Sequence, residues 1–112
     1  MEFIDKVLTP QEIERLRKQF GNYFKLTIDL ENKWIFVGSG LHADAEKLLL
    51  KKGSRQDDIW GGGIDLKKKL IDTTAVLNLR PRLGNDSLEI LDQKRREKFI
   101  EIVKNYFRKL WH

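Results

Sequence analysis

The stretch FKLTIDLENKWIFV, residues 24–37, decides the fold class of this chain. In its first half, apolar residues alternate with polar ones, which is the period of a strand with one buried face. A polar segment at residues 31–33 follows, and an apolar run at residues 34–37 comes directly after it. Two such runs around a short polar turn predict a β-hairpin, and therefore an antiparallel sheet.

Three amphipathic helices are expected to pack against this hairpin. The first follows Thr9, which forms a Thr-x-x-Glu capping box with Glu12, and it ends at Gly21. The second has its apolar stripe on residues 41–49. The third has a longer apolar stripe on residues 99–110.

A second hairpin is predicted around the basic turn at residues 67–69. Its first strand is the glycine-rich segment 59–66, and its return strand covers residues 70–79. A short N-terminal strand at residues 3–7 is a further candidate. The fold class is therefore α+β, with an antiparallel sheet of two hairpins, extended by that N-terminal strand, packed with three amphipathic helices.

The composition is that of an ordinary globular domain, with 40% hydrophobic and 35% charged residues. A length of 112 residues suits one domain, which we assign to residues 1–112. The absence of cysteine excludes disulfides, thiolate metal sites and a cysteine nucleophile. The N-terminal segment has acids where a signal peptide has a basic region, and no apolar run approaches the roughly 18 residues of a membrane span, so we expect a cytoplasmic protein.

The net charge of +5 is concentrated near the C-terminus. Residues 92–112 carry seven basic and three acidic groups, a net charge of +4, and the other residues carry 15 basic and 14 acidic groups, a net charge of +1. A solvated helix face and a contact surface for phosphates both explain this excess.

The segment GSGLHA, residues 38–43, formally matches the G-x-G-x-x-A form of the dinucleotide-binding fingerprint. That fingerprint requires a parallel βαβ unit, whereas the strand before it belongs to an antiparallel hairpin, so we exclude this site. A P-loop is excluded because no Gly-Lys-Ser/Thr follows. A plain strand-to-helix turn and an anion site on backbone N–H groups both remain open.

His42 and Glu46 are four residues apart and share one face of the second helix. They supply at most two metal ligands, and although Asp57 or Asp58 could supply a third, nothing in the spacing requires it, so no metal site is assigned. They are candidates for an acid–base pair, or for a surface pair in which the nearby Asp44 complements the helix dipole. Either Glu46 or Asp44 can also form a structural ion pair with Arg80.

Long polar and aromatic side chains follow the second helix. Arg55, Gln56 and Trp60 can grip and stack on a planar or anionic ligand, although Trp60 equally suits the core. Asn78 and Arg80 are two residues apart in the predicted return strand and its end, so they are expected to project from one face.

Three motifs occur in order along the chain: His-Ala-Asp-x-Glu, Gly-Ser-x-Gln-x-x-x-Trp-Gly and Asn-x-Arg-Pro-x-x-x-Asn. In these motifs the chain resembles a family of small, uncharacterised prokaryotic proteins, catalogued only as a domain of unknown function. The resemblance runs from about residue 25 to the last helix. The sequence differs from the family pattern at the glycines after Trp60 and at Asp86. The resemblance implies no activity and no cofactor. The matching positions are His42, Asp44, Glu46, Gly53, Ser54, Gln56, Trp60, Gly61, Asn78, Arg80, Pro81 and Asn85.

We expect these residues to form a pocket that binds a small polar or anionic ligand, such as a nucleotide or a phosphorylated metabolite, with hydrolysis as a further option. The cofactor is left unassigned, and whether the protein is an enzyme stays open. The candidate catalytic residues are His42 and Glu46. The candidate ligand-binding residues are Asp44, Arg55, Gln56, Trp60, Asn78, Arg80 and Asn85.

Two alternatives use the last helix. A nucleic-acid-binding module would contact phosphates through Lys94, Arg95, Lys98, Lys104 and Arg108. A homo-oligomer would instead form through the apolar side chains at positions 107, 110 and 111.

Overall fold

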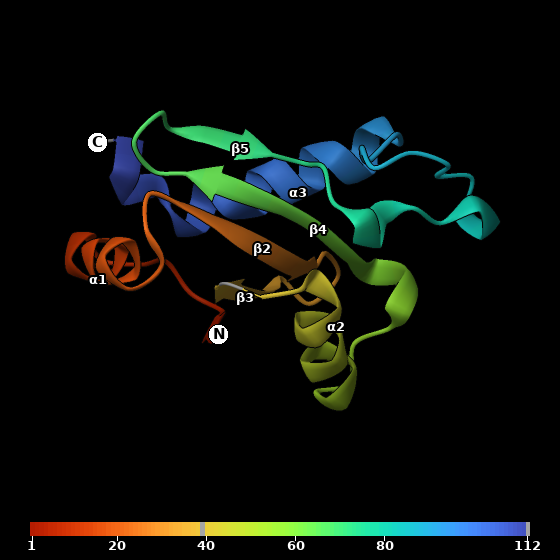
Figure 1. Cartoon of the computed structure of the whole chain (residues 1–112), viewed down its shortest axis with the longest axis horizontal. Helices are drawn as coiled ribbons and strands as arrows, with labels where there is room; N and C mark the ends of the chain where they lie inside the picture. The colour runs from red at the N-terminus through yellow and green to blue at the C-terminus, as the bar shows by residue number, and fades with distance from the viewer. Residues whose placement is uncertain (39, 112) are drawn as a thin grey trace.

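The computed structural model describes residues 1–38 and 40–111 and shows a five-stranded antiparallel sheet with strand order β1-β3-β2-β4-β5 (Figure 1). The strands are β1 (Glu2–Ile4), β2 (Tyr23–Asp29), β3 (Trp34–Gly38), β4 (Ile59–Asp65) and β5 (Leu70–Asp72). The helices are α1 (Pro10–Phe20), α2 (His42–Lys51) and α3 (Gln93–Tyr106), with short 3-10 turns at Gln56–Asp58, Val76–Asn78, Pro81–Leu83 and Arg108–Trp111. The predicted α+β class, with its two hairpins, N-terminal strand and three helices, is confirmed. Across the described part of the chain, each helix is too short or too polar to cross a membrane.

The helices α1 and α3 cover one face of the sheet. On this face, Leu26 and Ile28 of β2 are fully buried in an apolar cluster with Leu16 of α1 and Phe99 of α3. Figure 1 shows α3 running along the back of the strands. Burial of this apolar surface stabilises the fold by about 25 cal/mol per Å².

The helix α2 covers only one end of the opposite face, where β2 finishes and β4 begins (Figure 1). There Thr27 and Asp29 are buried, and Asp29 accepts a hydrogen bond of 2.5 Å from the hydroxyl of Ser54, which follows α2. At the other end of β2, Lys25 is only half-buried and Tyr23 is 46% exposed. Part of this face is therefore open to solvent.

Glycines in β4 allow side chains to lie directly on its backbone on this second face. A Cβ atom on Gly61 would lie 2.9 Å from Cδ2 of His42 at the start of α2. A Cβ atom on Gly63 would lie 2.2 Å from the hydroxyl oxygen of Tyr23. The His42 and Tyr23 rings therefore lie over two glycines on the same side of one strand.

The glycine between them, Gly62, faces the main core. A Cβ atom on Gly62 would lie 2.8 Å from Cζ of Phe99 and 2.0 Å from the carbonyl oxygen of Asp72. The close approach of α3 and of the last residue of β5 to Gly62 is therefore one reason why β4 is rich in glycine.

The return strand of the second hairpin is shorter than the sequence predicts, because β5 ends at Asp72. The Oδ1 atom of Asp72 accepts hydrogen bonds from the backbone N–H and the hydroxyl of Thr74, at 2.9 and 2.6 Å, and this Asx-type turn redirects the chain. Residues Val76–Asn78 then form a 3-10 turn. The prediction that Asn78 and Arg80 project from one face of a strand is therefore wrong.

Asn78 instead completes the edge of β4 beyond the end of β5. Its Oδ1 atom accepts a hydrogen bond of 2.8 Å from the N–H of Gly61, and its Nδ2 atom donates one of 2.9 Å to the carbonyl of the same residue. Nδ2 also donates to the carbonyls of Thr73 and Leu88. Because Asn78 is fully buried, its side-chain amide takes the place of a neighbouring strand.

The substitution Asn78→Ala tests this role. It leaves the buried N–H and C=O of Gly61 without these partners, so the free energy of unfolding should fall by about 3 kcal/mol. Urea unfolding followed by circular dichroism measures the change. The matched control Asn105→Ala, at an exposed position of α3, should change it by less than about 0.5 kcal/mol. Equal unfolding midpoints for the two variants would contradict the assignment.

Candidate functional site

The fold brings five of the predicted site residues together around β4. His42 and Glu46 come from α2, Trp60 lies in β4, and Asn78 and Arg80 come from the segment after β5. His42 and Asn78 bond to the backbone of β4, and Arg80 links the carbonyl at the start of this strand to α2. Residues distant in sequence therefore meet at one strand.

The other predicted residues lie outside this group. Asp44, Arg55 and Gln56 are exposed, at the start of α2 and in the turn before β4. Asn85 is buried in the segment between β5 and α3, where its Nδ2 atom donates to three backbone carbonyls and its Oδ1 atom accepts from a backbone N–H. The contacts of Asn85 thus hold that segment together.

Arg80 links α2 to β4. Its Nη2 atom lies 2.9 Å from Oε2 of Glu46, in an ion pair whose two side chains are 11% and 16% exposed. Its Nη1 atom donates to the carbonyls of Gln56 and Ile59, at 3.0 and 2.7 Å. Burial lowers the pKa of Arg80, and the Glu46 carboxylate opposes that shift. Both Nη atoms of Arg80 therefore bond to other groups of the protein rather than being directed at a ligand site.

Trp60 is also engaged within the protein. Its side chain is fully buried, and its Nε1 atom donates a hydrogen bond of 2.9 Å to the carbonyl of Asp57. The guanidinium carbons of Arg80 and Arg95 lie 4.9 and 4.3 Å from the centre of its ring, which is within the range of cation–π attraction. In the described part of the chain, every buried side-chain nitrogen and oxygen has a hydrogen-bond partner.

His42 differs from these residues because part of its ring remains available. It is half-buried, and its Nε2 atom lies 2.9 Å from the carbonyl oxygen of Gly62. A carbonyl oxygen can only accept, so in the neutral ring Nε2 carries the proton and Nδ1 keeps its lone pair. The Glu46 carboxylate bonds to Arg80, so the two members of the predicted acid–base pair have different partners.

Three residues near His42 were not predicted as site residues. Lys25, which pairs with Gly63 across the sheet, donates a hydrogen bond of 2.7 Å to the carbonyl of Gly40. The Tyr23 hydroxyl lies 3.2 Å from Oδ2 of Asp72. The charges of Lys25 and Asp72 both act on the His42 imidazole. We call His42, Tyr23, Lys25 and Asp72 the His42 cluster.

The sequence carries only a weak signal for these additions. Tyr23 and Lys25 occupy the polar side of an alternating strand, which normally faces solvent. Tyr23 and Lys25 come near His42 for two reasons. The short helix α2 leaves this part of the face uncovered, and Gly61 and Gly63 of β4 have no side chains. In the described residues, no group of three or more histidines and carboxylates is arranged to hold a metal ion.

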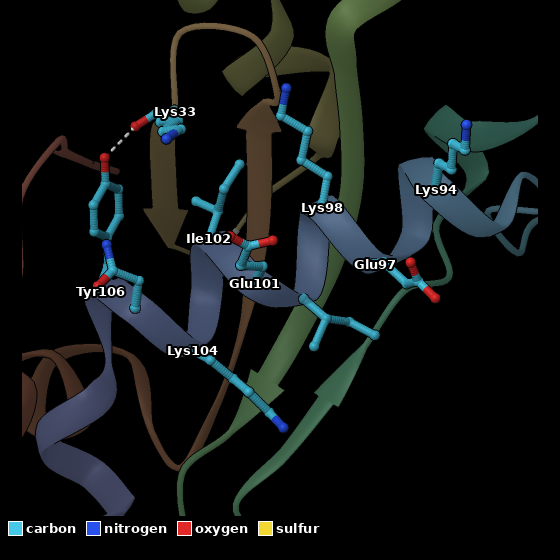
Figure 2. A pocket seen from close by; sticks show the side chains of 10 residues that line it. Lys33, Lys94, Glu97, Lys98, Glu101, Ile102, Lys104 and Tyr106 are labelled. Atoms are coloured by element: carbon cyan, nitrogen blue, oxygen red, sulfur yellow. Dashed lines mark hydrogen bonds between the residues drawn. The ribbon is translucent and has the colours of Figure 1, made fainter.

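A separate hollow of about 970 Å³ lies on the outer face of α3 (Figure 2). Of the basic residues predicted to contact nucleic acid, Lys94, Lys98 and Lys104 line it. Arg95 instead lies over Trp60. The remaining lining residues are Lys33, Glu97, Ile100, Glu101, Ile102, Asn105 and Tyr106. Four lysines and two glutamates give this hollow a modest positive charge.

The model of one protein family, described as a protein of unknown function, matches residues 2–106. This match confirms the resemblance inferred from the three sequence motifs. No curated protein and no solved structure matches the chain. The matched segment includes every residue of the His42 cluster.

The pH dependence of stability tests the environment of His42. Burial, and then the charge of Lys25, lower its pKa below 6.5, while the Gly62 carbonyl and Asp72 oppose this shift. Between the lowered pKa and 6.5, the unfolded state binds more protons than the folded state. The contribution of His42 to the free energy of unfolding is therefore fully present above pH 6.5 and is lost as the pH falls through this window. His42→Gln should remove that component, measured by urea unfolding at several pH values.

An NMR titration of the ring protons gives the second readout. The sequence has two histidines, so His42 is assigned by comparison with the His42→Gln variant. A midpoint at or above 6.5 for His42 would contradict the described burial.

Proposed function

We propose that this chain, which belongs to the DUF5674 family, binds a small phosphate- or carboxylate-bearing ligand at the His42 cluster. The observation that carries the proposal is the imidazole of His42, whose Nε2 atom bonds to the Gly62 carbonyl so that Nδ1 is left as an acceptor, and whose pKa is lowered in part by the charge of Lys25. The His42 and Lys25 side chains are both half-buried, and the neighbouring Tyr23 is 46% exposed, so this part of the sheet face is open to solvent.

The cluster carries one positive charge, on Lys25, and one negative charge, on Asp72, so an anionic group would bind at the Lys25 end, and the Nδ1 atom of His42 suits a hydroxyl group of the same ligand. Lys25 uses one donor on the carbonyl of Gly40, and its ammonium group has two more. The Nδ1 atom of neutral His42 can accept a hydrogen bond from a ligand hydroxyl, while Tyr23 offers a ring face and a phenol. A phosphorylated metabolite or a nucleotide combines these features.

Arg80 and Glu46 support this site indirectly. Their ion pair and the bonds from Arg80 to the carbonyls of Gln56 and Ile59 hold α2 against the start of β4. Because His42 is the first residue of α2, its position over Gly61 depends on this attachment. The expected cytoplasmic location of this binding activity stays a prediction.

The ligand proposal predicts a phosphate-dependent rise in thermal stability. Inorganic phosphate and nucleoside monophosphates at millimolar concentrations should raise the melting temperature, because they bind the native state. Lys25→Met, which keeps the side-chain length, and His42→Gln should each raise the Kd about tenfold or more, a loss of about 1.4 kcal/mol. Scanning fluorimetry and calorimetry provide the measurements.

The control is Lys104→Met, a change of the same kind on α3, far from the His42 cluster in sequence and on the opposite side of the sheet. It should bind as the wild type does. The proposal is wrong if the wild type shows no shift with any of these compounds, or if all three variants behave alike.

A second candidate function is nucleic-acid binding at the hollow on α3, because three of the predicted basic contact residues line that hollow. Each phosphate contact to a single strand contributes about 0.7 to the slope of log affinity against log salt. Replacing Lys94, Lys98 and Lys104 together by alanine should therefore lower this slope by about 2. Fluorescence anisotropy with single-stranded RNA at several salt concentrations measures it.

The control for this experiment is Lys47→Ala, which removes an exposed charge from α2. It should leave the affinity and the salt slope within error of the wild type. Absence of RNA binding at low salt would remove the second candidate.

A further inference from the structure

We propose that the His42 cluster cleaves RNA, with His42 as the general base, Tyr23 as the general acid and Lys25 as the contact to the phosphate. This inference rests on the proposed function, because it names the substrate class of the same site. The supporting observations are the arrangement of these groups over β4, the openness of the face and the basic turn beside it.

The positions of His42 and Tyr23 suit a base and an acid that act on one phosphate. The two rings lie over Gly61 and Gly63, on the same face of β4. Positions two residues apart in a strand are separated by about 7 Å. A phosphorus centre between two such groups can have its attacking and leaving oxygens within hydrogen-bond distance of one group each.

Both groups start in the protonation state that the reaction needs. Burial lowers the pKa of His42, so the imidazole is neutral at neutral pH and can accept a proton on Nδ1. Burial and the neighbouring charge of Asp72 raise the pKa of Tyr23, so the phenol keeps its proton until a stronger base takes it. The carboxylate of Asp72 also holds the hydroxyl, at 3.2 Å.

The surroundings also admit a polymer that presents the same phosphate and hydroxyl groups as the small ligand proposed for this site. Tyr23 is 46% exposed as a residue, with its hydroxyl lying over Gly63, so a chain of nucleotides can cross the surface around the acid. Tyr23 is near the carboxylates of Asp65 and Asp72, and after Leu66 the exposed lysines 67–69 supply three positive charges at the same end of β4. A phosphodiester backbone that passes Lys25 and Tyr23 can therefore continue along this basic turn.

The reaction is an internal transesterification. Nδ1 of His42 takes the proton of the ribose 2′-hydroxyl, and the 2′-oxygen forms a bond to phosphorus. The bond from phosphorus to the 5′-oxygen breaks, and that oxygen receives the proton of Tyr23. Lys25 neutralises the charge on the non-bridging oxygens. The products are a 2′,3′-cyclic phosphate and a 5′-hydroxyl, and proton exchange with water restores His42 and Tyr23.

The test uses a DNA oligonucleotide with a single ribonucleotide, labelled with a fluorophore and a quencher, and the full chain. The wild type should cleave it only after the ribonucleotide, and mass spectrometry should find the cyclic phosphate. An oligonucleotide of DNA alone should stay intact. His42→Gln and Tyr23→Phe should each lower the rate about 100-fold, the usual scale of acid–base catalysis.

The Tyr23→Phe variant, a control variant and a check of folding distinguish loss of catalysis from loss of structure. Tyr23→Phe removes one oxygen and keeps the ring over Gly63. Gln19→Ala is the control, because it changes an exposed polar side chain of α1 on the other face of the sheet, and it should cleave at the wild-type rate. Circular dichroism and the melting temperature show that each variant is folded.

The outcomes separate this inference from the proposed function. If phosphate and the DNA oligonucleotide bind in a manner that depends on Lys25 but RNA stays intact, the inference is overturned and the proposed function stands. If neither binding nor cleavage occurs, both are overturned. Cleavage at the same rate by the wild type and His42→Gln identifies a contaminating nuclease and also overturns the inference.

Discussion

The rest of this structure depends on three consecutive glycines in β4, residues 61–63, because a side chain at any of these positions would collide with its neighbours. These glycines let Phe99 approach β4 from one side, and the rings of His42 and Tyr23 from the other. A Cβ atom at any of the three positions would lie within 3 Å of another atom, closer than packed side chains allow. Three glycines, which are unfavourable in a strand on intrinsic grounds, are therefore required here by close approach on both faces.

The start of β4 also needs hydrogen-bond partners, because β5 pairs only with residues 63–65, and polar side chains supply them. After β5 ends, the amide of Asn78 bonds to the N–H and C=O of Gly61, and the guanidinium of Arg80 bonds to the carbonyl of Ile59. The pair of Arg80 with Glu46 is nearly buried, and such pairs add little net stability because desolvation offsets their attraction. Its clearer effect is geometric, since it fixes where α2 lies on the sheet.

Local signals in the sequence were sufficient for most of the fold. The capping box at Thr9 and the alternation in β2 each depend on near neighbours, and both elements formed as predicted. The end of β5 was missed because its cause, the turn made by Asp72 with Thr74, leaves the apolar pattern of residues 70–79 unchanged. A periodic pattern shows which residues are suited to burial but does not show whether they form a strand, and in the 3-10 turn Val76–Asn78 it is Asn78 that is buried while Val76 is exposed.

The site shows a different limit of sequence reasoning. The motifs identified residues that meet around β4, but residue type alone does not distinguish an arginine that grips a ligand from one that grips a carbonyl of its own chain. The guanidinium of Arg80 lies over the ring of Trp60 and donates a hydrogen bond to the carbonyl of Ile59. Tyr23 and Lys25 were overlooked because an exposed strand face is the ordinary place for them.

These two groups of residues have connected roles. The ion pair of Arg80 with Glu46 determines the position of α2 relative to β4, and Asn78 holds the segment that carries Arg80 against Gly61. His42 is the first residue of α2. A change in Arg80, Glu46 or Asn78 would therefore act on the open face by displacing the imidazole from its bond to Gly62. Since hydrogen bonds weaken steeply with poor alignment, such a displacement would weaken the contact that keeps the proton on Nε2. The structural role of the motif residues and a chemical role for His42 are thus compatible, because the first sets the geometry that the second requires.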